Sequence, residues 1–219
     1  VTKLGKIHRD LLSWAATVRR PLPAQLMQDL MGLPPSKLGY LWTDLVRDQF
    51  DTMGAMTREV LNFARGDSEA LIRKVYLNDF VASVQEGMQR TVEGLGIDLE
   101  VTTSDTGAAW FDETKIRRAL QNLVRNSIEA MPAGGELAIG FDRDAEDALR
   151  ISVRDTGGGV PEEIRDVLYD SFVTTGKKNG TGLGLAIVRR IVQEHEGSID
   201  FRSVKDQGTT FTMRLPQDR

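Results

Sequence analysis

Three separated stretches of the sequence carry residue types that can bind a phosphorylated ligand. The first, residues 155–161, places an acidic side chain shortly before three glycines. An ionised carboxylate only accepts hydrogen bonds, so a buried Asp155 needs donors, such as the exocyclic amine of an adenine. Glycines such as Gly157 and Gly159 let the backbone approach a ligand closely. An ordinary turn has a similar composition, so this stretch alone does not identify a site.

The second stretch contains three glycines, Gly180, Gly182 and Gly184, and leads directly into an apolar helical pattern. The free N–H groups and the dipole of a helix start both favour an anion, so this spot suits a phosphate group. No strand immediately precedes the glycines, which argues against the dinucleotide-binding fingerprint, and the spacing is not that of a Walker A loop.

The third stretch, residues 115–131, has a helical pattern in which Asn122 and Asn126 lie four residues apart on one face. Neutral amide oxygens suit a Mg²⁺ ion that phosphates also hold, because magnesium keeps few protein ligands. Two solvent-exposed asparagines are the alternative interpretation, since asparagine is usually exposed.

Along the chain the order is the asparagine stretch, the acidic stretch, Phe172 and then the glycines at 180–184. This order resembles the ATP-binding domain of sensor histidine kinases. These kinases are members of the gyrase, Hsp90, histidine kinase and MutL superfamily, and the resemblance covers roughly residues 78–216. It implies ATP and Mg²⁺ as cofactors, with adenine at Asp155, magnesium at Asn126 and Asn122, and a catalytic role for Asn122. The nucleotide-binding set that it implies also includes Gly157, Gly159, Phe172, Thr174, Thr175, Lys177, Lys178, Gly180, Thr181, Gly182, Leu183, Gly184 and Thr210.

The polar segment 172–179 is predicted to be a mobile lid over the phosphates. Lys177 and Lys178 offer positive charge, although solvated loop lysines are the alternative. The family commonly has Thr-Thr-Lys here, whereas Gly176 intervenes in this chain. Which lysine reaches the nucleotide therefore stays open.

The helices and strands expected from the sequence are mixed along the chain. Their order predicts an α/β (α+β) sandwich, with one mixed sheet covered on one face by helices. An all-α helical hairpin precedes it. We expect a hairpin domain at 1–66, a hinge and first strand at 67–77, and the ATP-binding domain at 78–219. Strands are predicted at 73–77, 97–101, 136–141, 149–154, 198–204 and 209–215. Helices are predicted from a cap at 78–79 to about 95, from Asp112, over 161–171, and after the second glycine stretch.

The hairpin carries apolar residues at helical spacing on both sides of a break at 31–36. Two helices cannot bury that stripe alone, so pairing with a second copy as a four-helix bundle is expected. This resembles the dimerisation hairpin of histidine kinases and implies a homodimer. A helical cap docked on the ATP domain is the alternative. A first residue of Val suggests a fragment, with any sensor or membrane segment upstream.

The chain contains two histidines, His8 and His195, that could receive a phosphate. His195 matches a position where the family often has a non-catalytic histidine, and we interpret it as structural. His8 is the candidate phosphoacceptor. The family signature ending in Pro-Leu, however, matches residues 16–22 better and places Ala16 in the histidine position. Either His8 accepts the phosphate in an unusual context, or this hairpin has no acceptor.

Function classes differ at one position of the third motif. Hydrolytic relatives have a glutamate as general base where this chain has Asn122, which cannot take a proton, so transfer to a side chain fits better than hydrolysis. We therefore expect a two-component histidine kinase whose partner is a response-regulator receiver domain. The alternative is a nucleotide-gated dimeric scaffold, or a phosphatase-biased regulator that lacks a phosphoacceptor.

Composition limits the partners further. A net charge of −4 and a pI near 5.3 without a basic stripe argue against nucleic acid. The absence of cysteine excludes disulfides and thiolate metal sites. No apolar run reaches the length of a membrane span, so we expect no membrane contact within this sequence and a cytoplasmic location.

Overall fold

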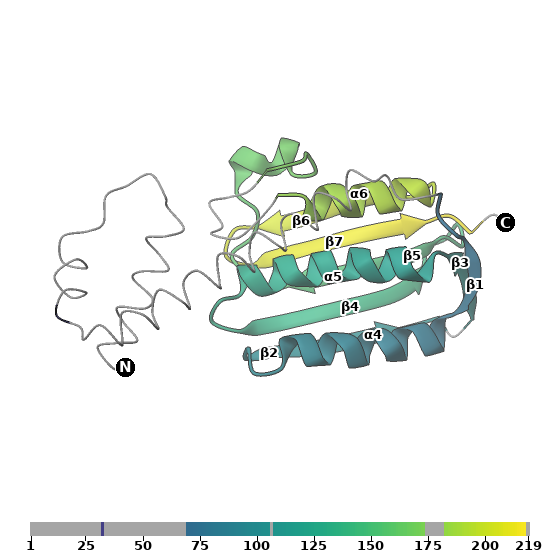
Figure 1. The fold of residues 1–219 in the computed structure, drawn as a ribbon, viewed down its shortest axis with the longest axis horizontal. Coiled ribbons are helices and arrows are strands. Elements are labelled where there is room, and N and C mark those ends of the chain that lie inside the picture. The colour runs from purple at the N-terminus through teal and green to yellow at the C-terminus, as the bar shows by residue number, and fades with distance from the viewer. Residues whose placement is uncertain (1–31, 33–68, 106, 174–181, 218–219) are drawn as a thin grey trace. The chain divides into compact units, whose positions relative to one another are not determined.

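The computed structural model describes residues 32, 69–105, 107–173 and 182–217 (Figure 1). Except for Gly32, these residues belong to one compact unit of the chain. The predicted hairpin with His8, and the predicted ligands Thr174, Thr175, Lys177, Lys178, Gly180 and Thr181, lie outside the described residues. The division at 66 and 77 stays a prediction.

The domain alternates strands and helices without strict βαβ order. Its elements, in chain order, are β1 (Arg73–Tyr76), α4 (Leu77–Val92), β2 (Ile97–Thr103), β3 (Ala108–Phe111), α5 (Glu113–Ala130), β4 (Gly135–Arg143), β5 (Leu149–Asp155), the 3₁₀ helix η1 (Glu162–Val167), α6 (Gly184–Glu194), β6 (Ser198–Val204) and β7 (Gly208–Leu215).

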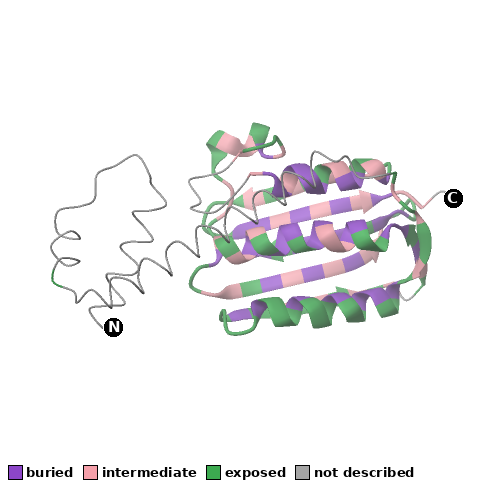
Figure 2. Cartoon of the chain, in the orientation of Figure 1, coloured by how far each residue is buried: buried purple, intermediate pink, exposed green. Residues whose placement is uncertain are grey.

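Five of the strands form one mixed sheet in the order β2-β4-β5-β7-β6, in which β2 and β4 are parallel and the other pairs antiparallel. The strands form because apolar residues alternate with polar ones: in β5, Leu149, Ile151 and Val153 are buried whereas Arg150 and Arg154 are exposed. Figure 2 shows this alternation along the sheet. The predicted mixed α/β sandwich is therefore confirmed.

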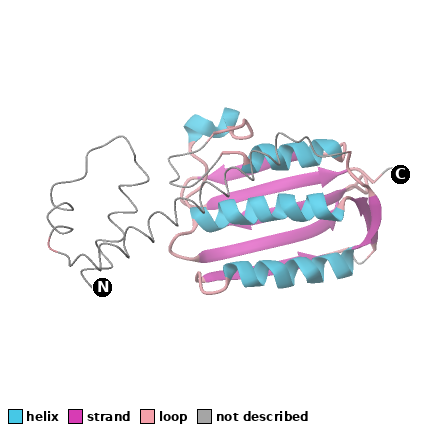
Figure 3. Ribbon diagram, viewed as in Figure 1, coloured by secondary structure: helices cyan, strands magenta, loops and turns pink. Residues whose placement is uncertain are grey.

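Helices α4, α5 and α6 cover one face of the sheet (Figure 3). Helix α5 begins where the Asp112 side chain accepts a hydrogen bond from the Lys115 N–H at 3.0 Å, an N-cap. Its apolar residues Ile116, Leu120 and Leu123 recur at helical spacing and are fully buried. None of the described helices is long and apolar enough to cross a membrane.

A second, two-stranded antiparallel sheet pairs β1 with β3 at the end of the domain where α5 begins (Figure 1). The sequence interpretation missed β3, and it placed the first strand's end at Leu77 instead of Tyr76. It was also wrong to cap α4 with Asn78 and Asp79. The helix begins at Leu77 without a side-chain cap, and the N–H of Leu77 donates to the Gly107 carbonyl instead.

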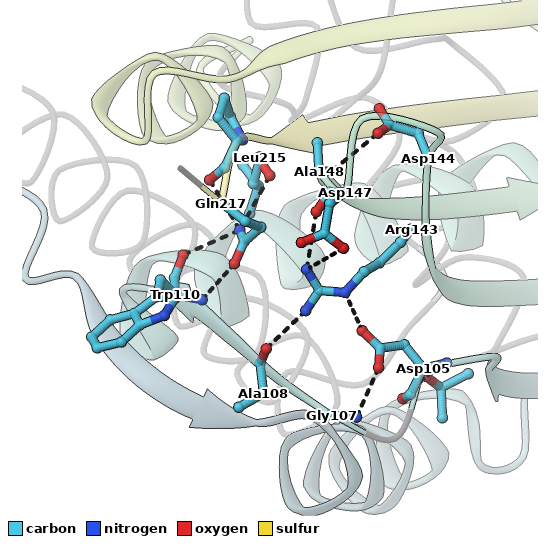
Figure 4. Close-up of polar contacts among 12 residues, drawn as sticks. Asp105, Gly107, Ala108, Trp110, Arg143, Asp144, Asp147, Ala148, Leu215 and Gln217 are labelled. Carbon is cyan, nitrogen blue, oxygen red and sulfur yellow. Dashed lines mark hydrogen bonds and ion pairs between the residues drawn. The ribbon is translucent and has the colours of Figure 1, made fainter. Parts of the chain in front are cut away.

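Arg143 anchors the approach to β3 onto the main sheet (Figure 4). Its guanidinium donates to the Asp105 carboxylate, to the Ala108 carbonyl at 2.8 Å and to the Asp147 carbonyl at 2.9 Å. In the same view, the Gln217 side chain accepts from the Trp110 N–H at 2.6 Å. These contacts tie the small sheet to β4, to the β4–β5 turn and to the residues that follow β7.

Candidate nucleotide-binding site

Asp155 ends β5 and, among the predicted site residues that the structure describes, is held by hydrogen bonds from three donors. It is 3% exposed. Its Oδ1 accepts hydrogen bonds from the Gly157 N–H at 2.9 Å and the Thr209 N–H at 3.2 Å, and its Oδ2 accepts from the Ser127 hydroxyl at 3.1 Å. An ionised carboxylate has about four acceptor positions, so these three donors leave room for one more from a ligand.

Two of these partners, Ser127 and Thr209, were not predicted from the sequence. Ser127 directly follows Asn126, and that neighbourhood is the only signal that could have indicated it. Thr210, which the sequence interpretation placed in the nucleotide site, pairs with Arg154, whereas Thr209 pairs with Asp155. Successive strand residues face opposite sides of a sheet, so the structure favours Thr209 and we do not carry Thr210 forward.

The glycine-rich loop after Asp155 packs tightly against the protein itself. A Cβ added at Gly157 would lie 2.7 Å from the Ala130 carbonyl oxygen at the end of α5. Gly159 has φ +79°, and a Cβ there would lie 2.7 Å from the Val204 carbonyl oxygen. These glycines therefore let the loop pack closely between α5 and β6.

The start of α6 lies directly over the middle of α5. Leu183, the N-cap residue, is fully buried, and Gly184 is the first helical residue. A Cβ added at Gly184 would lie 3.3 Å from the Asn122 Oδ1 and 3.2 Å from an Arg125 guanidinium nitrogen. The structure thus brings the glycine-rich helix start and the first asparagine together, as expected for one shared site.

Asn122 is 9% exposed, and its amide donates to the Arg118 carbonyl at 3.0 Å while its oxygen accepts from Arg125 at 3.4 Å. Asn126 is half-buried, and the structure gives its side chain no hydrogen bond to another described residue. No three His, Cys, Asp or Glu side chains gather as a possible metal site in the described ranges. A cation here would depend on amide oxygens and on phosphates, a donor set that fits Mg²⁺.

Phe172 is the first residue of the predicted lid at 172–179, of which the structure describes residues 172 and 173. Its side chain is 64% exposed and its backbone has φ +70°. Its N–H donates to the Gly182 carbonyl at 2.9 Å. Gly182 has φ +67°, and a Cβ there would lie 2.5 Å from the Phe172 backbone, so only glycine fits this close approach.

His195 lies at the C-terminal end of α6, on the far side from Gly184. It is 4% exposed; its Nδ1 donates to the Ile191 carbonyl at 2.7 Å, and its Nε2 accepts from the Asp112 N–H at 2.9 Å. Burial lowers the pKa of His195 below its usual value. A neutral ring held at both nitrogens is a structural histidine, in agreement with the sequence interpretation.

Comparisons with known proteins place this domain in a family. The model of the histidine kinase-, DNA gyrase B- and HSP90-like ATPases matches residues 111–219. The catalytic domain of the histidine kinase ThkA, solved in a nucleotide-free form, is 31% identical with a TM-score of 0.60, and the match covers 67% of this chain and 95% of that one. The chain belongs to this family of histidine kinase-type ATPases.

Other members of the family are similar over more of the chain. The sensor protein SrrB of Staphylococcus aureus is 31% identical over 182 residues, which are 79% of this chain and 31% of SrrB. Full-length ShkA, solved in complex with AMPPNP, has a TM-score of 0.69 and 28% identity, and the match covers 84% of this chain and 39% of ShkA.

ThkA has also been solved in complex with the response regulator protein TrrA. That structure has a TM-score of 0.64 and 25% identity to this chain, and the match covers 84% of this chain and 51% of that one. The chain spans about a third of the length of the curated relatives it matches.

Proposed function

We propose that this chain is the catalytic core of a two-component histidine kinase. It binds ATP with Mg²⁺, transfers the γ-phosphate to a histidine, and passes it on to an aspartate of a response regulator. The observation that carries the proposal is the Asp155 carboxylate, which three donors fix with one acceptor position left beside the glycine-rich loop. Membership of an ATPase family supports ATP as the nucleotide.

In this proposal, Asp155 accepts a hydrogen bond from the exocyclic amine of adenine. Its orientation is set before the ligand arrives, because donors from α5, from its own loop and from β7 hold it. A preorganised acceptor loses little freedom when the ligand binds.

The phosphates lie toward the start of α6, where helix N–H groups and the dipole favour negative charge. Asn122 and Asn126 would hold the magnesium ion, which supplies charge neutralisation at the phosphates when bound. Gly180, Thr181 and one of Lys177 and Lys178 complete the phosphate contacts in this proposal, with Thr174 or Thr175 adding a hydroxyl.

The reaction class follows from the residue types on α5. Water activation for hydrolysis needs a general base, and an asparagine amide such as that of Asn122 takes up no proton at neutral pH. Transfer to a protein nucleophile relies on positioning and electrostatics instead. The close approach of Asn122 to Gly184 at the start of α6 supports such positioning, because it brings an amide next to the proposed phosphate site.

His8 is the proposed phosphoacceptor, and residues 1–66 are the proposed homodimerisation hairpin. Incubation with γ-labelled ATP tests whether His8 accepts the phosphate. We expect label on the wild type and none on His8→Ala. His195→Gln is the matched control and should still take up label, because His195 is buried and bonded at both nitrogens.

The second candidate is a nucleotide-gated scaffold without a phosphoacceptor, which the match of residues 16–22 to the family signature favours. In that case neither the wild type nor His8→Ala takes up label, although both bind ATP. The complex of ThkA with its response regulator supports a receiver domain as the partner under either candidate.

A further inference from the structure

The Asp112 side chain connects the start of α5 to the segment that enters the domain. Its Oδ1 caps the helix through the Lys115 N–H at 3.0 Å, and its Oδ2 accepts from the Leu71 N–H at 2.9 Å. Leu71 lies five residues after the predicted hairpin, so this bond holds the last turn of chain before β1 to α5.

The same residue is bonded to the end of α6. The Asp112 N–H donates to the His195 Nε2 at 2.9 Å, and the Lys115 ammonium lies 2.7 Å from the Glu194 carboxylate. Arg190, one turn earlier in α6, also pairs with Glu194. The first turn of α5 and the last turn of α6 are therefore fastened by two independent polar contacts, both largely removed from water.

Helices α5 and α6 run antiparallel, because their contacts at two levels fix their relative direction. At one level Asn122 lies under Gly184, in the proposed phosphate region. At the other, Asp112 meets His195. A displacement of α6 relative to α5 at the phosphate end is thus carried by a packed pair of rigid helices to the Asp112 end.

The Leu71 N–H is held to α5 by its hydrogen bond to the Asp112 Oδ2. Leu71 is 57% exposed, so burial of its own side chain contributes little to holding this residue, whereas the neighbouring Ile72 is half-buried. The Leu71 N–H can therefore be bonded to Asp112 or open to water at modest cost. A change in the packing of α5 against α6 can therefore favour or disfavour the hydrogen bond between Leu71 and Asp112.

We propose that Asp112 and His195 are positioning residues that couple nucleotide occupancy to the segment 69–72, by holding the Leu71 N–H when α5 and α6 are fixed by the ligand. The proposal rests on the proposed function for its ligand. It assigns residues outside the nucleotide site to communication with the hairpin proposed for residues 1–66.

The test follows amide hydrogen exchange residue by residue in the full chain, with and without Mg²⁺ and AMPPNP. In the wild type the Leu71 amide should be protected, and saturating nucleotide should slow its exchange about twofold, since a ligand raises the free energy of openings that disturb its site. Calorimetry on the same samples reports nucleotide binding independently.

Asp112→Ser separates the two hydrogen bonds of Asp112, the N-cap to Lys115 and the bond to Leu71. Serine is a good N-cap for the Lys115 N–H but lacks the second acceptor for Leu71. We expect the Lys115 amide to stay protected and the Leu71 amide to lose its protection and its nucleotide response. The nucleotide Kd should rise by no more than about twofold, because the coupling acts equally in both directions. Retained nucleotide response at Leu71 in this variant would overturn the proposal.

His195 variants provide the second arm. His195→Gln keeps an acceptor for the Asp112 N–H and should retain the response, whereas His195→Phe should abolish it without abolishing nucleotide binding. Equal behaviour of the two variants would contradict a positioning role. If AMPPNP does not bind to the wild type, the proposed function and the coupling both fail. If it binds without changing the Leu71 amide, only the coupling fails.

Discussion

The two ends of helix α5 each hold a buried aspartate, and the two carboxylates differ in what they bond to. Asp112 caps the start of the helix and spends its second oxygen on the backbone of the entering segment. Asp155, beside the end of the helix, accepts from three different elements and keeps an acceptor position beside a glycine-rich loop. The same residue type thus has two uses: Asp112 holds the backbone at one end of α5, and Asp155 is available to a ligand at the other.

The largest effect should come from Gly208→Ala, which breaks the Asp155 end. Gly208 has φ +102°, and a Cβ there would lie 1.9 Å from the Asp155 carbonyl oxygen. Left-handed strain and overpacking together predict a loss of about 2–5 kcal/mol in the free energy of unfolding. Urea denaturation measures it. Gly158→Ala is the control, since a Cβ there meets nothing within 4 Å, and equal losses in both variants would refute this account.

Asp155→Asn should separate ligand binding from structure at that same end. The asparagine oxygen can still accept from the Gly157 and Thr209 N–H groups, so the fold should be largely kept. Loss of the charged acceptor should weaken ATP binding by about 1–3 kcal/mol. Calorimetry with AMPPNP and Mg²⁺ measures the affinity, and an unchanged Kd would count against adenine recognition by this residue.

Asp112→Ala is the matched change at the other end of α5. Loss of the N-cap should lower the free energy of unfolding by about 0.5–2 kcal/mol. The nucleotide Kd should stay close to that of the wild type, because Asp112 lies away from the site. A large loss of affinity comparable to that of Asp155→Asn would remove the distinction between the two aspartates.

The smallest effect should be a pH dependence at the Asp112 end. Burial lowers the pKa of His195 from 6.5, and Asp112, Lys115 and Glu194 are the charged groups around it. The unfolded chain therefore takes up this proton first as the pH falls. Stability should be fully present above pH 6.5 and should decline below it, toward the lowered pKa of the folded state.

His195→Gln removes this titration, so its unfolding free energy should fall less steeply than that of the wild type below pH 6.5. Denaturation curves at a series of pH values compare the slopes. Parallel slopes in the two proteins would show that His195 contributes nothing to the acid sensitivity.

The sequence predicted the features whose cause is local. Apolar alternation identified five strands of the main sheet, and the cap and spacing of α5 identified that helix. The strand β3 escaped because Ala108–Phe111 is short and pairs with β1, far away in the chain. The choice between Thr209 and Thr210 depends on strand register, and the Leu71 contact with Asp112 joins residues 41 positions apart. Such long-range pairings leave no periodic signal in the chain.

The hydrogen bond between Phe172 and Gly182 has a consequence for protein engineering. It holds Phe172 and Gly182 next to each other, irrespective of how many residues connect them. Doubling the length of such a connection costs only about 0.6 kcal/mol of closure entropy. A fluorophore-bearing insert between these two residues should therefore leave the first turn of α6 in register with α5, and it would report on the segment that carries the proposed phosphate ligands.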